Sequence, residues 1–123
     1  GRLADEFRRD AAAARAVVPI EAARAAAGLG FSRPDGGTVE YRGEPGGLMR
    51  RTALAGSSPS REMFRLTERA QPVFAVEESD GITVAVLSFE GDAGSAWRLE
   101  AIVGRDLRFV EGLDGNGVQG EAE

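Results

Sequence analysis

The segment Leu3–Val18, LADEFRRDAAAARAVV, carries the clearest helix signal in the chain. Its apolar side chains recur every three or four residues, which places one apolar stripe along a helix: Leu3, Phe7, Ala11, Ala14 and Val18. Pro19 ends the helix, because proline lacks the N–H that an interior helical position needs. Isolated helices below about 12–15 residues are marginal in water. We therefore expect the rest of the chain to cover this stripe.

The other side of the same helix is charged. Glu6 and Arg9 are spaced i,i+3, and Asp5 and Arg9 are spaced i,i+4, which are the spacings at which opposite charges support a helix. Beyond Pro19, the alanine-rich segment Ile20–Gly28 predicts a short second helix, with a loop or an irregular strand as the alternative.

From Leu29 onward the sequence has the pattern of a β meander, in which short β-prone runs are separated by clusters of Gly, Pro, Asp and Ser. The expected strands are Leu29–Ser32, Thr38–Arg42, Leu48–Ala53, Glu62–Thr67, Val73–Glu78, Ile82–Phe89, Ala96–Val103 and Leu107–Val110. Ser79, Asp80 and Gly81 have the length and chemistry of a hairpin turn. Ile82–Phe89 is apolar on both faces, which is typical of a strand in the middle of a sheet.

These elements predict an α+β fold, in which one N-terminal amphipathic helix packs on an antiparallel sheet of hairpin-linked strands. Residues 1–111 are expected to form one globular domain. Residues 112–123 are acidic and glycine-rich, and we expect a disordered tail there.

The composition limits the chemistry that is available to the chain. Among its 123 residues there is no histidine and no cysteine, which excludes Ser-His-Asp and Cys-His catalysis, disulfides and thiolate metal sites. All 15 basic residues are arginine, and the net charge is −5 with both signs interspersed, so no basic face for nucleic acid is apparent. We therefore expect that the chain is not an enzyme and that it binds no cofactor.

Two acidic segments are weak candidates for sites. Glu77, Glu78 and Asp80 could act as a hydrolytic carboxylate pair, but solvated turn residues are the simpler interpretation. The run Asp114–Gly117, DGNG, is similar in composition to a calcium-binding loop. It lacks the spaced acidic ligands and the closing glutamate of a defined calcium site.

Two further pairs are weak candidates for binding surfaces. Trp97 and Tyr41 could form a binding surface, although lone aromatic residues on alternating strands are more often in the core. Arg50 and Arg51 could contact an acidic partner, although one arginine on each face of a strand more often marks exposure at a sheet edge.

A family resemblance extends over most of the chain, and it begins with LADEFRRDAAAARAVV. This segment resembles the solvent-side half of the long helix in prepilin-type proteins, in particular the minor pseudopilins of bacterial type II secretion systems. The hairpin PDGGTVEYR (residues 34–42) followed by GLMRR (residues 47–51) resembles a hairpin of that family. The family's prepilin-peptidase site and apolar half-helix are not in the printed sequence, which begins at Gly1, and we expect a segment upstream of it.

The resemblance implies a pilin-like structural subunit of a type II secretion or related type IV pilus-like filament, which acts in protein export with other pseudopilin subunits. It implies a periplasmic domain that is anchored in the bacterial inner membrane only through the upstream segment. The helix charges that would meet neighbouring subunits are Asp5, Glu6, Arg8 and Arg9. Their simpler interpretation is a solvated helix face. The alternative function is a small α+β ligand-binding domain with a curved sheet and a pocket.

Overall fold

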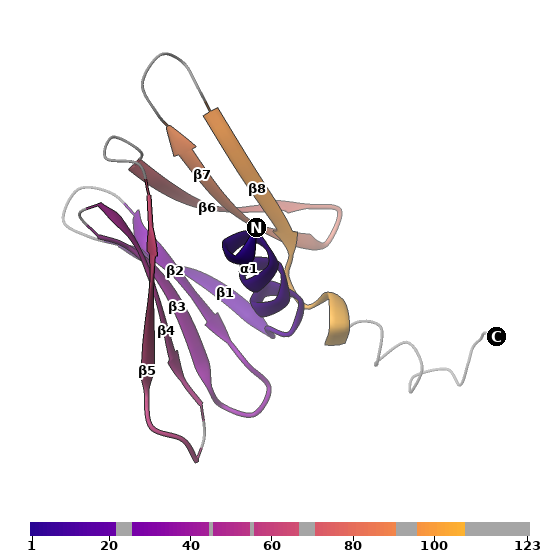
Figure 1. The fold of residues 1–123 in the computed structure, drawn as a ribbon. Helices are drawn as coiled ribbons and strands as arrows, with labels where there is room; N and C mark the ends of the chain where they lie inside the picture. Colours follow the sequence, from indigo (N-terminus) through magenta and orange to yellow (C-terminus); the bar gives the residue numbers. More distant parts are fainter. Residues whose placement is uncertain (22–25, 45, 55, 67–70, 91–95, 108–123) are drawn as a thin grey trace.

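The computed structural model describes residues 1–21, 26–44, 46–54, 56–66, 71–90 and 96–107. The chain begins with a short helix, α1 (Arg2–Ala12), and continues as strands that form two antiparallel sheets (Figure 1). In chain order the strands are β1 (Ala16–Glu21), β2 (Ala26–Ser32), β3 (Thr38–Glu44), β4 (Gly47–Ala53), β5 (Ser60–Arg65), β6 (Gln71–Ser79), β7 (Ile82–Glu90) and β8 (Ala96–Ile102).

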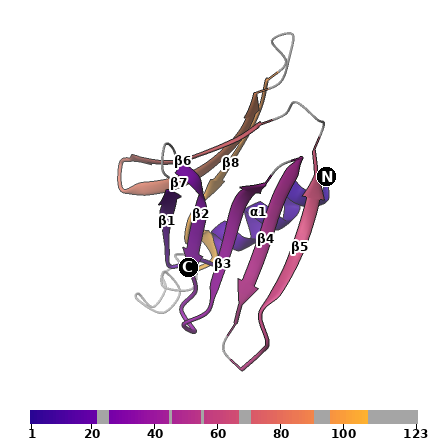
Figure 2. The same ribbon diagram turned by 90° about the vertical axis from the view of Figure 1, so that its left-hand side faces the viewer.

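Each sheet follows the order of the chain. The larger sheet runs β1-β2-β3-β4-β5, the smaller runs β6-β7-β8, and every neighbouring pair of strands is antiparallel. Strand β6 packs against β1, β2 and β3, and α1 lies in the angle between the two sheets (Figures 1 and 2).

The expected fold class, one helix packed on one sheet, is therefore wrong. The fold is mostly β, with two sheets and a short helix between them. The physical reason lies in the amount of apolar surface. The larger sheet presents a broad apolar face that includes Leu29, Phe31 and Leu48, whereas the stripe of α1 consists largely of alanine. An alanine stripe cannot cover five strands, so β6–β8 fold over the rest of that face.

The helix ends earlier than its apolar periodicity predicts. It stops at Ala12, and the chain enters β1 at Ala16, where Val17 and Val18 favour a strand. The backbone N–H of Gly104 donates a 2.9 Å hydrogen bond to the Ala11 carbonyl and so satisfies part of the helix C-terminus. Pro19 lies inside β1, where it is tolerated because β1 is an edge strand.

Two other local predictions fail, and two are confirmed. The predicted helix Ile20–Gly28 is wrong, because its described ends belong to β1 and β2. The predicted strand Leu107–Val110 is not observed at Leu107, which lies in a helical turn. Residues 108–110, like the expected tail at 112–123, lie outside the described residues.

Strand β7 is the middle strand of its sheet, as predicted. The predicted hairpin turn is also confirmed, with positive φ at Asp80 and Gly81, as in a type I′ turn.

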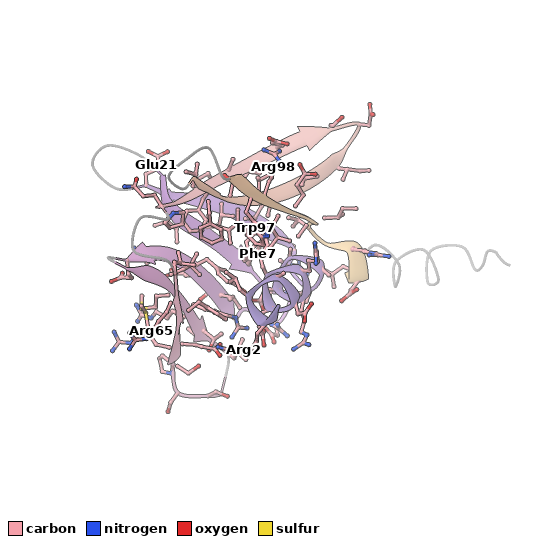
Figure 3. All side chains as sticks on the ribbon, turned by 45° about the horizontal axis from the view of Figure 1, so that its top comes forward. Arg2, Phe7, Glu21, Arg65, Trp97 and Arg98 are labelled. Carbon is pink, nitrogen blue, oxygen red and sulfur yellow. The ribbon has the colours of Figure 1, made fainter. Side chains whose placement is uncertain are left out.

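The core lies where α1 meets the inner faces of both sheets. Phe7 has no exposed surface, and its ring makes edge-to-face contacts with Phe31 and Tyr41, with centroid distances of 5.7 and 5.2 Å. Leu87 and Leu99 contribute buried side chains from the smaller sheet. Figure 3 shows Phe7 beneath that sheet. Within the described residues, no helical segment has the length and apolar character needed to cross a lipid bilayer.

Candidate subunit interface on the N-terminal helix

The inner face of α1 is attached to the larger sheet by a buried carboxylate. Asp10 is 4 % exposed and accepts two hydrogen bonds from the guanidinium of Arg50. Nε of Arg50 donates to Oδ2 at 2.7 Å, and Nη2 donates to Oδ1 at 2.8 Å. The hydroxyl of Tyr41 donates to the same Oδ2 at 2.5 Å. A bidentate arginine–carboxylate pair fixes orientation as well as distance. The helix is therefore held in one rotational setting against β3 and β4.

The ion pairs continue along the same side of the helix. Glu6 lies 3.6 Å from Arg50 and 3.6 Å from Arg9. Glu62 on β5 lies 3.7 Å from Arg50 and also pairs with Arg2, whose guanidinium lies over the Phe64 ring at 4.5 Å. Arg50 therefore faces three carboxylates, and α1 is connected to β3, β4 and β5.

This environment changes two proton equilibria. The hydrogen bonds to Asp10 raise the pKa of Arg50, which keeps the guanidinium charged. Burial raises the pKa of Tyr41 well above its usual range, and the negative charge of Asp10 and the hydrogen bond to it raise the pKa further. The phenol therefore stays neutral in the folded chain.

The raised pKa of Tyr41 predicts a loss of stability at alkaline pH. An unfolded tyrosine ionises near pH 10, whereas the folded phenol resists ionisation, so its contribution to stability is complete below about pH 10 and is lost as the pH rises further. Tyr41 is the only tyrosine. In a titration of near-ultraviolet phenolate absorbance, we expect ionisation to coincide with loss of the folded circular dichroism signal. Ionisation near pH 10 in a chain that is still folded would contradict the buried placement.

The outer face of α1 carries most of the predicted interface charges. Asp5, Arg8 and Arg9 are exposed, whereas Glu6 is half-buried and turned toward Arg50. The structure thus brings three of the four residues together on one solvent-facing side and uses the fourth in the attachment of the helix.

A shallow hollow borders this outer face. Its volume is about 170 Å³, and it is lined by Arg8 and Ala12 of α1 and by Glu100, Ala101, Ile102 and Arg105. Pockets for drug-sized ligands are typically about 300–1,000 Å³. This hollow is therefore too small to support the alternative prediction of a ligand-binding domain.

The other candidate residues are dispersed. Glu77 pairs with Arg98 at 3.0 Å, while Glu78 and Asp80 point to solvent at the β6–β7 hairpin. Among the described residues, no group of three acidic side chains could hold a metal ion, and the Asp114–Gly117 segment lies outside them.

The two aromatic candidates differ in burial. Tyr41 is in the core, as predicted, whereas Trp97 is 43 % exposed. The centroid of the Trp97 ring lies 5.0 Å from that of the Phe89 ring. The prediction that Trp97 is a core residue is wrong, because Trp97 lies near the start of β8, whereas Ala101 and Ile102, at the other end of that strand, are the residues that border α1.

The sequence analysis did not predict the cluster of Asp10, Arg50 and Tyr41, although the position of Asp10 in the helix pointed to it. Asp10 follows Phe7 by three residues and Leu3 by seven, which places a charge inside the apolar stripe. A charge in that position requires a buried partner. Arg50 is that partner, so β4 is not the exposed edge strand that the Arg50–Arg51 pair suggested.

Comparison of this chain with protein-family models, with curated proteins and with solved structures finds no match. One face of α1 is fixed to the domain by buried hydrogen bonds, and the other presents charges of both signs to solvent.

Proposed function

We propose that this chain is the globular part of a structural subunit of a secretion filament, of the minor pseudopilin kind, and that the outer face of α1 contacts neighbouring subunits. The observation that carries the proposal is the attachment of α1 through Asp10 and Arg50. A filament subunit must present its helix in a fixed orientation, since neighbouring subunits repeat one geometry. A bidentate buried pair supplies that orientation.

The exposed side of α1 supports the same proposal. Asp5, Arg8 and Arg9 remain in solvent, with both signs of charge on one face. Charges of both signs at the rim of an interface set register and partner choice more than affinity.

We propose that the full-length protein is anchored in the bacterial inner membrane through a segment outside the printed sequence, and that this domain lies in the periplasm. The resemblance of LADEFRRDAAAARAVV to the solvent-side half of the prepilin helix supports this proposal.

A cross-linking experiment tests the α1 contact. The chain contains no cysteine, so Arg8→Cys introduces a single thiol on the outer face of the helix. In full-length protein produced together with the other pseudopilins, we expect thiol cross-links from position 8 to those subunits. The control is Ser57→Cys, an exposed position in the loop between β4 and β5. Equal cross-linking from both positions, or none from position 8, would refute the proposed contact.

Charge reversal on the same face gives a quantitative test. We expect Arg8→Glu with Arg9→Glu to lower affinity for the neighbouring subunit about tenfold, because rim charges steer and orient association. The matched change Arg15→Glu with Arg33→Glu alters the net charge equally and is not on α1. Binding measured by surface plasmon resonance should change little in this control.

A further inference from the structure

The outer face of the larger sheet is an arginine- and methionine-rich surface that no described element covers. Figure 2 views this face directly, with α1 behind it. Leu48 and Phe64 point inward, so the alternate positions of β4 and β5 point outward. We call the arginine and methionine side chains at these outward positions of β3, β4 and β5 the arginine face: Arg42, Met49, Arg51, Arg61, Met63 and Arg65. The same side of β3 also carries Glu40 and Glu44.

Two arginines of this face repel each other. Arg51 and Arg61 are directly opposite on adjacent strands, where like charges destabilise a sheet. Glu40, the cross-strand neighbour of Arg51, pairs with Arg42 at 3.2 Å. Among the described side chains, no carboxylate lies within ion-pair distance of Arg51, Arg61 or Arg65.

The composition of the face is that of a binding surface. Arginine and methionine are enriched in protein interfaces relative to other surfaces. Met63 is 50 % exposed and lies between Arg61 and Arg65 along β5. The net charge of the whole chain is −5, whereas the four arginines and two glutamates on this side of β3, β4 and β5 sum to +2, so the face is opposite in sign to the molecule as a whole.

The complementary surface is the turn between β6 and β7. Glu78 and Asp80 are exposed there, and the two-residue turn holds them at the end of a long hairpin. Neither is in an ion pair with another described residue, whereas Glu77 is already paired with Arg98. Figures 1 and 2 both place this turn on the side of the molecule opposite β5.

We propose that the acidic β6–β7 turn of one copy binds the arginine face of a second copy. This inference rests on the proposed filament function and adds a second contact to it. The two surfaces differ and lie on opposite sides of the chain, so the contact is head-to-tail and leaves one free surface of each kind at the ends. A hairpin turn is small, so the contact is weak in isolation and gains strength when subunits are held in an array.

Sedimentation velocity of the 123-residue chain over a concentration series tests the contact. At low ionic strength we expect the weight-average sedimentation coefficient to rise with concentration, and at high ionic strength we expect it to stay constant. Arg51→Glu with Arg61→Glu should lower the association constant at least about tenfold, and so should Glu78→Arg with Asp80→Arg. Circular dichroism establishes that each variant is folded.

Mixing the two variants is the decisive step. Each variant alone has two surfaces of the same sign, whereas an equimolar mixture again pairs opposite signs, so we expect association to return. Arg15→Glu with Arg105→Glu is the charge-matched control on exposed positions outside both surfaces, and it should associate as the unchanged chain does.

Two results would overturn this contact: an unchanged chain that stays monomeric at every concentration, or a mixture that does not associate. Cross-linking from position 8 to other subunits would persist in either case if the proposed function is correct, so the two failures are distinguishable.

Discussion

We expect the Phe7→Ala chain to lose about 3–5 kcal/mol of its free energy of unfolding. Phe7 is fully buried and touches the rings of both Phe31 and Tyr41, so its removal leaves a cavity between α1 and the larger sheet. Edge-to-face contacts add about 0.5–1.5 kcal/mol per pair beyond the area that they bury. Both contacts are lost with the ring. Urea unfolding at neutral pH, followed by circular dichroism, measures the loss.

The matched control for this cavity is an exposed apolar side chain. Val18 is 57 % exposed on the outer side of β1. Its replacement with alanine should change the free energy of unfolding by less than about 1 kcal/mol. Equal effects at the two positions would mean that α1 does not pack between the sheets.

Replacing Asp10 with asparagine should cost about 3 kcal/mol, at the lower end of the roughly 3–5 kcal/mol expected when one partner of a buried ion pair is removed. Asparagine keeps the shape of the side chain but removes the charge that Arg50 faces at 2.7 and 2.8 Å. The cost is at the lower end because Glu6 and Glu62 remain 3.6 and 3.7 Å from the guanidinium. Urea unfolding again provides the measurement.

A double-mutant cycle isolates the pair. In the Arg50→Met background the buried cation is already absent, so Asp10→Asn should cost clearly less than it does in the unchanged chain. Additive effects would show that the two side chains act independently. Arg98→Ala, which breaks an exposed ion pair with Glu77, is the control and should have little effect.

The sequence predicts β3 to β8 because each of these strands has a local signal, whereas β1 and the start of β2 were expected to be helical. The β6–β7 hairpin follows from Asp80 and Gly81, which permit the positive φ values of a two-residue turn. The alternation along residues 38–42 places Val39 and Tyr41 on one face, and both are buried. Period-two patterns of this kind depend only on residues that are close in the chain.

The division into two sheets has no comparable local signal. Hairpin-linked strands have the same pattern whether the next strand extends a sheet or starts another. The end of α1 was misjudged for a related reason. Ala14 and Val18 continue the helical period, but pairing of β1 with β2 decides the conformation beyond Ala12. Tertiary pairing of this kind overrides helix propensity.

The candidate site was predicted in part. The exposed charges of α1 follow from its periodicity, whereas the Asp10–Arg50 pair joins residues 40 positions apart. Arg51 and Arg61 could be recognised as a like-charged pair only after the register of β4 against β5 was known. Sequence periodicity gives the face on which a side chain lies, and register is needed to identify the residue opposite it.

The hydrogen bond from Gly104 to Ala11 has a consequence for the order of events in folding. The ribosome makes α1 before the strands, yet one donor to its C-terminal carbonyls, the N–H of Gly104, is made only after β8. Closing so long a loop is entropically costly, and contacts between distant residues slow the search for the native state. We therefore expect the C-terminal end of α1 to reach its final packing late, after Phe7 has packed on Phe31 and Tyr41 of the larger sheet.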